Sequence, residues 1–317
     1  MKLKTILTIV TGLFLVLVLY QIFGEPNRPD QEAITEAQYP DITAPESCQA
    51  ILTLSGGNFR QLDSMQMGET VHDAGVVIQK TAEGELKYRL ENTRTKNPGL
   101  THMLLNPKGS RVAVVTLADG SKVWLNNESS LRYGVDFGSR ERLVELTGEA
   151  YFEVVHDPNR KFIIKCLEFS MSTDGGRFHI NHYQDEVTKW MNMIEGSGLM
   201  TVSFGHKPTG RVKAGQQAQA NHGTLLNIID SLNEEKVLAW KNQKFYFTQD
   251  DIKSVMLQVA RWYDVNPVFR VLSGAKINGD FSRNEPLSTI LAELEKQTTL
   301  RFEIQGKDVI ITSATGN

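Results

Sequence analysis

The chain has 317 residues, with 34 Lys and Arg against 37 Asp and Glu and a formal net charge of −3. This length suits two compact domains plus an anchor. The nearly balanced charge argues against a protein that binds nucleic acid through a basic surface. Hydrophobic residues make up 40% of the chain and charged residues 22%, which is ordinary for a folded protein and excludes disorder over the whole chain.

An almost unbroken apolar stretch covers residues 6–23, with Lys2 and Lys4 before it and Glu25 and Asp30 after it. A helix of this length, at about 1.5 Å per residue, nearly crosses a hydrocarbon core of about 30 Å. The positive-inside rule then leaves residues 1–5 in the cytoplasm and exports the rest. We predict a transmembrane helix over 6–23 and a linker over 24–48. A cleaved signal peptide is the alternative, but no small-residue cleavage site follows.

Strict alternation of apolar and polar residues marks the segment 142–155. Successive side chains of a strand face opposite sides, so this segment predicts one buried face and one solvated face. Gly148, on the apolar side in mid-strand, indicates a bulge or a close backbone approach. Earlier, Asp119 and Gly120 join two apolar runs with a dipeptide typical of tight hairpins. Alternation returns over residues 131–137.

Turn signals recur about every ten residues up to residue 220, which predicts an antiparallel all-β domain over 49–220, either a sandwich or a roll. A shallow β-solenoid remains possible. Residues 51–63 repeat the hairpin pattern of residues 114–126. Among the predicted turns are Lys96 to Gly99 and Asp174-Gly175-Gly176, and the following strands are expected over 177–183, 187–194, 199–204 and 211–220.

Beyond residue 240 the period of the pattern changes. Strands are predicted over 244–247, 267–271, 276–281, 300–304 and 309–311. Asp250 or Asp251 caps a helix whose apolar residues follow the i, i+3, i+4, i+7 rule, and Pro286 begins a second helix. This order predicts a split βαβ module over 240–317, with two helices on one face of a small sheet. Residues 221–239 are a connector that could contain a short helix.

Several spaced blocks of this sequence resemble the central domain of FecR-type transmembrane sensors, the anti-sigma regulators of cell-surface signalling. The blocks are residues 117–126, 129–133, 144–154 and 157–162. The matching motif positions are Asp119, Gly120, Trp124, Leu125, Asn126, Leu131, Arg132, Tyr133, Gly148, Glu149, Ala150, Tyr151, Phe152, Asp157 and Pro158. The C-terminal module resembles the short N-terminal domain shared by secretins and TonB-dependent receptors, and the C-terminal extension of one FecR subgroup.

The resemblance implies a single-pass sensor of the inner membrane with most of its chain in the periplasm. An outer-membrane TonB-dependent transducer would contact the exported part, and the sensor would control an extracytoplasmic-function sigma factor. The C-terminal module would be the docking unit, and its sheet edges could accept a partner strand by β-augmentation. Its candidate docking residues are Trp262, Tyr263, Phe281, Arg283 and Phe302.

The cytoplasmic part departs from the family pattern. FecR-type proteins usually carry a cytoplasmic helical segment that grips the sigma factor, whereas only residues 1–5 precede the span here. Five residues are too few for an interface of roughly 800 Å² per partner. We expect that the sigma-binding segment is a separate polypeptide, that the start codon was placed late, or that this protein no longer contacts sigma.

No catalytic or metal-binding motif emerges from the sequence, so we expect neither an enzyme nor a cofactor. His179 and His182 lie three apart in a strand and therefore face opposite sides. Glu145, Glu149 and Glu153 share one strand face, but neighbours are about 13 Å apart, beyond the spacing of a glycosidase pair. The expected role of this face is contact with solvent.

Cysteine pairing and the exposure of aromatic residues are left open by the pattern. Cys48 and Cys166 would lie in an oxidising compartment, but we expect one loose thiol in the linker and one small strand residue, without a disulfide. Tyr151 is expected on the outward face of its strand and Trp124 beside a hairpin arm; exposed aromatics would serve protein recognition, but core packing is the favoured role for most of the aromatic residues. The rival hypotheses are a cell-envelope binding or assembly module, holding glycan or a partner protein, and an envelope glycan hydrolase.

Overall fold

The computed structural model describes residues 41–91, 99–135, 137, 142–203, 209–221 and 225–314. Residues 41–317 form one compact unit. The predicted membrane span at 6–23 and most of the predicted turn at 96–99 lie outside the described residues. Within the described ranges, no helix is both long enough and apolar enough to cross a bilayer.

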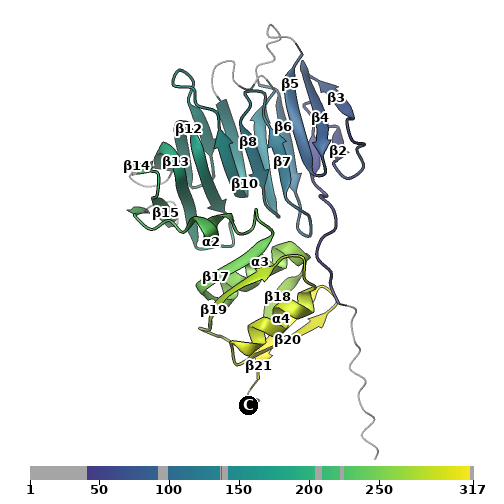
Figure 1. Cartoon of the computed structure of the whole chain (residues 1–317), viewed down its shortest axis with the longest axis vertical. Coiled ribbons are helices and arrows are strands. Elements are labelled where there is room, and N and C mark those ends of the chain that lie inside the picture. The colour runs from purple at the N-terminus through teal and green to yellow at the C-terminus, as the bar shows by residue number, and fades with distance from the viewer. Residues whose placement is uncertain are drawn as a thin grey trace, which may run out of the picture. The chain divides into compact units, whose positions relative to one another are not determined.

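Sixteen strands form one continuous hydrogen-bonded sheet in the first part of the described chain (Figure 1). They are β1 (Ile51–Thr53), β2 (Phe59–Gln61), β3 (Thr70–Asp73), β4 (Val76–Ala82), β5 (Glu85–Leu90), β6 (Thr101–Asn106), β7 (Ala113–Thr116), β8 (Lys122–Leu125), β9 (Ser129–Gly134), β10 (Arg142–Val154), β11 (Phe162–Lys165), β12 (Phe169–His182), β13 (Thr188–Val202), β14 (Thr209–Lys213), β15 (Gln217–Asn221) and β16 (Leu225–Ile229). The prediction of a mainly β domain is confirmed.

The long strands β10, β12 and β13 connect two halves of this sheet. The first half of β10 pairs with β9 and β11, and its second half pairs with β8 and β12. Side chains from the two halves meet in a single core, where the ring centroids of Phe152 and Phe162 are 6.2 Å apart. The sheet therefore folds on itself around one apolar layer, as in a sandwich. The pairs β5–β7 and β10–β11 are parallel, unlike the predicted antiparallel arrangement.

The predicted turn at Asp174-Gly175-Gly176 is wrong, because β12 runs straight through it. Gly176 pairs with Gly196 of β13 at a shift in register. A Cβ on Gly176 would lie 2.2 Å from the Glu195 carbonyl oxygen. These glycines therefore mark a β-bulge where two strands approach closely, and not a chain reversal.

Two further strand assignments change at the C-terminal end of the β sheet. The segment 211–220, predicted as one strand, divides into β14 and β15, which follow one another along β13. The start of the expected connector forms β16, which pairs with β15. Among the described residues of this segment, only α2 (Glu234–Leu238) is helical, and the Asn233 side chain caps it. The β sheet therefore extends beyond residue 220.

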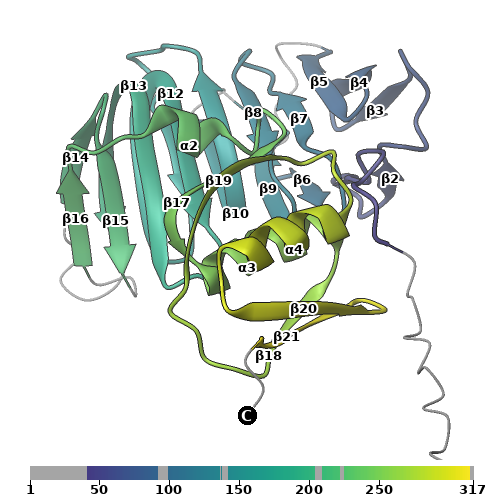
Figure 2. The same ribbon diagram turned by 60° about the horizontal axis from the view of Figure 1, so that its bottom comes forward.

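The C-terminal elements follow the predicted order. They are β17 (Lys244–Asp251), α3 (Ile252–Tyr263), β18 (Asn266–Phe269), β19 (Lys276–Ser282), α4 (Leu287–Lys296), β20 (Leu300–Gln305) and β21 (Asp308–Ser313). Asp251 caps α3 as predicted, accepting a hydrogen bond from Ser254 N at 3.0 Å. The prediction of a single small sheet is wrong, however. Strands β17 and β19 form one two-stranded sheet, and β18, β21 and β20 form a second sheet. Figure 2 shows α3 and α4 between the two.

Residues 41–48 pack against the folded chain and are not the spacer expected there. Leu287 N at the start of α4 donates to the Ile42 carbonyl at 2.8 Å, and Arg111 Nε donates to the Pro45 carbonyl at 2.9 Å. Cys48 is 1% exposed in the β core, which corrects the expectation of a loose thiol. Cys166 is half-buried beside the same core, and both thiols are free.

Candidate functional site

A buried ion pair explains the first motif aspartate. Arg142 is 1% exposed, and its Nη1 lies 3.1 Å from Asp119 Oδ2. Asp119 also accepts hydrogen bonds from the backbone N and the hydroxyl of Ser121. The other donors of Arg142 reach carbonyl oxygens of Val155, Arg160 and Asp174. This clamp joins the β7–β8 hairpin to the end of β10 and to the middle of β12, so Asp119 has a structural role.

The motif residue Gly148 lies at the point of β10 where pairing with β9 and β11 ends and pairing with β12 begins. Gly148 has a φ of +85°, and a Cβ there would lie 2.3 Å from Ser129 Oγ and 2.8 Å from the Glu128 carbonyl oxygen. The predicted close backbone approach is therefore present. The Ser129 hydroxyl accepts a hydrogen bond from Glu149 N at 2.8 Å, which holds the β8–β9 turn on β10.

A chain of hydrogen-bonded side chains crosses the outer face of the sheet from Glu149. Asn126 Nδ2 donates to Glu149 Oε2 at 2.6 Å, and His179 Nε2 lies 2.8 Å from Glu149 Oε1. His179 Nδ1 faces the amide of Asn192 at 3.1 Å, and Gln217 Nε2 donates to Asn192 Oδ1 at 2.7 Å. Since Asn192 offers its N–H to Nδ1, the proton of a neutral His179 ring resides on Nε2. Glu149 is therefore not the solvated strand residue that was expected.

Arg283 extends this chain into the C-terminal module. Its Nη1 lies 3.4 Å from Asn126 Oδ1, and its guanidinium stacks over Phe245 and Trp262 at 4.6 and 5.1 Å from the ring centroids. Arg283 is 3% exposed, and burial lowers its pKa to about 10. The motif residue Asn126 thus contacts a buried cation of the module, and the charge of the motif residue Glu149 acts on the same cation.

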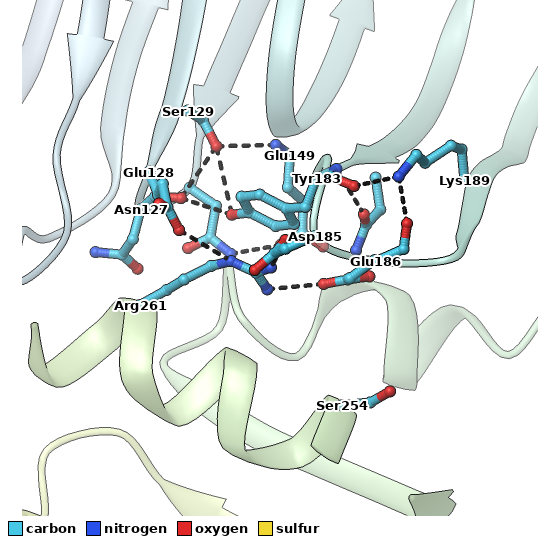
Figure 3. A network of polar contacts seen from close by, with 12 residues as sticks. Asn127, Glu128, Ser129, Glu149, Tyr183, Asp185, Glu186, Lys189, Ser254 and Arg261 are labelled. Atoms are coloured by element: carbon cyan, nitrogen blue, oxygen red, sulfur yellow. Dashed lines mark hydrogen bonds and ion pairs between the residues drawn. The ribbon is translucent and has the colours of Figure 1, made fainter. Parts of the chain in front are cut away.

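A second contact centres on Arg261 of α3 (Figure 3). The guanidinium binds Asp185 at 2.5 Å, Glu186 at 2.7 Å and Glu128 at 3.3 Å. It also lies over the ring of Tyr183, 3.6 Å from the centroid. Because Glu128 belongs to the β8–β9 turn and the other partners to the β12–β13 loop, one arginine fastens two loops of the β domain to α3. The Tyr183 hydroxyl donates to the Asn127 carbonyl at 2.6 Å and joins the loops further.

The carboxylates at this contact have pKa values displaced in opposite directions. Burial acts to raise the pKa of Glu149, but hydrogen bonds from His179 and Asn126 and the charge of Arg283 outweigh it and hold that pKa below its usual range. Burial raises the pKa of Glu186, with Arg261 acting in the opposite direction. Arg261 keeps a raised pKa although burial works against its charge, because Tyr183, Glu186 and Asp185 surround it.

The outer-face aromatics are covered by the segment that leads into the C-terminal module. Tyr151 is 2% exposed, and its ring centroid lies 5.3 Å from that of the half-buried Trp124. Lys241 Nζ lies 4.5 Å from the Trp124 ring centroid and 5.1 Å from that of Tyr151. Tyr151 is therefore buried although it lies on the outward face of β10, because the segment around Lys241 covers this face, which the sequence pattern did not show.

An open cleft of about 730 Å³ lies beside these contacts. One wall is the outer face of β12, β13 and β15, and the other is formed by β17, α3 and the segment around α2. Aromatic and amide side chains share the lining, among them Trp190, Trp240, Tyr246, Asn181 and Gln217. Its size is typical of ligand sites.

The remaining motif residues divide between the core and the surface. The buried members are Leu125, Leu131, Tyr133, Ala150 and Phe152. Arg132 is exposed and pairs with Glu145 at 3.6 Å. Asp157 accepts hydrogen bonds from the backbone N–H groups of Asn159 and Arg160 in the turn that begins at Pro158, while Gly120 adopts a φ of +89° in the β7–β8 turn.

The candidate docking residues lie mostly inside the C-terminal module. Trp262 is 0% exposed and donates its indole N–H to the Arg283 carbonyl at 2.8 Å. Tyr263 is buried and donates to the Glu285 carbonyl at 2.6 Å. Phe281 and Phe302 are half-buried against the module core. These side chains stabilise the module, and partner contact would fall on its backbone edges or on other side chains.

Several residues that join the two modules escaped sequence reasoning. Arg261 and its partners Glu128, Asp185 and Glu186 are separated by 75 to 133 positions along the chain. Arg261 lies nine residues after Ile252, about 180° around the helix from the apolar stripe, so its position in the pattern predicted a solvent-facing residue. Within the described ranges, no group of three or more His, Cys, Asp or Glu side chains is placed to hold a metal ion.

The fold and contacts define a protein of two interacting modules, a β sandwich and a small α/β unit held together by buried arginines. Comparison with protein families agrees in both modules. The family model described as "FecR protein" matches residues 106–197, and that described as "FecR, C-terminal" matches residues 244–311. The chain belongs to the FecR family, whose members are regulators of sigma-factor signalling and not enzymes.

Solved structures show the same architecture. Two crystal structures of a protein from Parabacteroides distasonis ATCC 8503, provisionally assigned as an anti-sigma factor, match at a TM-score of 0.61 and 25% identity. The matches cover 68% and 67% of this chain and 99% and 98% of those chains. No curated protein matches the chain.

Proposed function

We propose that this protein is a membrane-anchored periplasmic sensor that relays the signal of an outer-membrane TonB-dependent transducer to an extracytoplasmic-function sigma factor. The observation that carries the proposal is the pair of FecR modules in one compact unit, matched by both family models. The anti-sigma assignment of the similar Parabacteroides protein supports it. The apolar stretch at 6–23 supports the membrane anchor.

The C-terminal module offers backbone edges for a partner strand. The β18 edge carries Pro267, which donates no hydrogen bond. On β20, Phe302 N is turned away from β21 and bonded to Glu295 Oε1 at 2.9 Å. By the two-residue alternation of an antiparallel ladder, Ile304 N–H faces the same way. We assign the β20 edge around Ile304 to transducer contact by β-augmentation.

Two measurements test this function. Pull-down of the full chain with the periplasmic signalling domains of the TonB-dependent transducers of the same genome should capture one of them, and Ile304→Pro should abolish the capture. Arg132→Ala, an exposed change on the β domain, is the matched control and should leave the capture intact. Deleting the gene should change transcription from a sigma-dependent promoter. Absence of both effects would refute the proposal.

A further inference from the structure

The cleft beside the module contact is lined by many hydrogen-bonding groups and by charged side chains of both signs, whose formal charges nearly cancel: five carboxylates (Glu149, Asp185, Glu186, Asp250 and Asp251) and four basic side chains (Lys236, Lys244, Lys253 and Arg283). Each carboxylate there already has a partner from the chain itself. Arg261 binds Asp185 and Glu186, and Lys236 binds Asp250 at 2.7 Å. A cationic ligand would therefore have to compete with existing ion pairs, and the five lining carboxylates do not favour an anionic one, whereas an uncharged ligand meets neither obstacle.

Primary amides on the sheet wall keep unused hydrogen-bonding capacity. Gln217 Nε2 donates one hydrogen bond to Asn192, and Asn181 Oδ1 accepts one from Tyr183 N at 3.3 Å. An amide has two N–H groups and two acceptor lone pairs, so both retain donors and acceptors at the half-exposed surface of the cleft. The chain through Asn192 and His179 to Glu149 fixes the orientation of Gln217.

Two buried donors at the cleft lack acceptors among the described residues. Trp240 Nε1 and Arg283 Nε both belong to lining residues, which are 5% and 3% exposed, and neither has a hydrogen-bond partner. A buried donor left unpaired costs roughly 1–3 kcal/mol. An oxygen-rich ligand in the cleft would supply the missing acceptors.

Aromatic rings provide the apolar complement of these polar groups. Trp190 on β13 and Tyr246 on β17 are half-buried and lie on opposite walls of the cleft. Such rings pack against apolar faces while their polar edges reach hydrogen-bonding groups. The lining thus combines ring surfaces, neutral amides and unpaired donors.

A peptide strand fits this cleft less well. On the β17 edge, Lys244 N donates to the Ala239 carbonyl at 2.9 Å and Thr248 N donates to Asp250 Oδ2 at 2.9 Å. Only Tyr246, between them, is left to pair with an added strand on this side. Strand addition needs a run of main-chain groups, which this edge does not offer.

We propose that the cleft binds a neutral saccharide, with sugar faces on Trp190 and Tyr246 and hydroxyl groups bonded to Asn181, Gln217 and Trp240. The proposal goes beyond the regulatory function and does not rest on it. A chain that captures no transducer could still bind the sugar, and a chain that captures one could lack sugar binding.

Isothermal titration of the full chain in a detergent without a sugar headgroup tests the proposal. The probes are hexasaccharides of β-1,4-glucose, α-1,4-glucose, β-1,4-xylose and α-1,6-mannose, with hexagalacturonate as the charged comparison. We expect saturable binding of at least one neutral probe and at least tenfold weaker binding of hexagalacturonate. Absence of binding by every neutral probe, or preference for the charged one, would overturn the proposal.

Variants locate the site. Trp190→Ala should weaken the binding of the neutral probe at least tenfold, and Tyr246→Ala serves the same purpose should the first variant fail to fold. Phe59→Ala is the matched control, because Phe59 is a 62% exposed aromatic outside the cleft. Unchanged affinity in a folded Trp190→Ala or Tyr246→Ala variant would show that the sugar binds elsewhere and refute the assignment.

Discussion

The Arg261 guanidinium stacks on the ring of Tyr183 with its Cζ 3.6 Å from the ring centroid. Tyr183 follows β12 of the sandwich, whereas Arg261 lies in the last turn of α3, so the stack crosses from one module to the other. The flanking carboxylates of Asp185 and Glu186 neutralise the buried cation. Attachment of the C-terminal module therefore depends on a charge that water cannot reach.

Replacing Arg261 should loosen this attachment. In Arg261→Ala, Glu186 would lose its cation while only 16% of its side chain is exposed, whereas Asp185 and Glu128 could hydrate. Breaking a buried pair costs about 3–5 kcal/mol, so with this partial hydration we expect a loss near 3 kcal/mol in urea unfolding. Arg301→Ala is the control, because the Arg301 side chain that pairs with Glu295 is 63% exposed, and it should change stability by less than about 1 kcal/mol. Equal losses in the two variants would contradict the assigned role.

The sequence pattern was enough to predict the elements whose structure depends on residues close to one another in the sequence. The alternation of 142–155 predicted β10 because one face packs in the core. Asp250 or Asp251 was predicted as the cap of α3, and the cap is Asp251, whose bond to Ser254 spans only three residues. The hairpin at Asp119-Gly120 followed from the same kind of information.

Features set by distant neighbours could not be predicted in this way. Gly175 and Gly176 resemble a turn in sequence, and only the opposing Gly196 makes them a bulge. Tyr151 alternates like a solvent-facing residue, but the Lys241 ammonium and the Trp124 ring, both distant in sequence, pack against its ring. The two small sheets of the C-terminal module have the same order of elements as one sheet, so the sequence pattern does not distinguish them.

Alanine substitutions at two glycines would separate the cost of a strained backbone φ angle from the cost of a steric clash at the added Cβ. Gly148 and Gly215 have φ angles of +85° and +84°, but only Gly148 has atoms within 4 Å of an added Cβ, beginning with Ser129 Oγ. Gly215→Ala should cost about 1–3 kcal/mol through backbone strain alone. Gly148→Ala should cost more, because the Glu128 backbone must also move. Equal free energies of unfolding for the two variants would argue against the close contact.

The pH dependence of stability should differ in sign between two carboxylates. The pKa of Glu149 is lowered in the folded protein, so its stabilising contribution is present above the unfolded pKa and is lost as pH falls through the folded pKa. Glu149→Gln should therefore be less stable than wild type at pH 7, with the difference shrinking below about pH 4.5.

Glu186 provides the opposite case for the same titration. The pKa of Glu186 is raised in the folded protein, so the folded state binds the Glu186 proton more tightly than the unfolded state does. The stabilisation that this proton gives is therefore full below the unfolded pKa and is lost as pH rises through the folded pKa. Relative to Glu186→Gln, wild type should gain stability as pH falls. Unfolding in urea at pH 7, 5.5 and 4 measures both trends, and slopes of the same sign would contradict the assigned environments.

The clamp between Asp119 and Arg142 allows a test that separates pairing from packing. Asp119→Ala leaves Arg142 uncompensated at 1% exposure, and we expect a loss of about 3–5 kcal/mol. Asp157→Ala, at the other motif aspartate, removes a pair with the exposed Arg160 and should cost much less than Asp119→Ala, because solvent screens an exposed pair. Replacing a buried pair by apolar residues is often neutral, so Asp119→Ala combined with Arg142→Met should recover part of the loss. A double variant less stable than Asp119→Ala would show that the carbonyl bonds of Arg142 matter more than its charge.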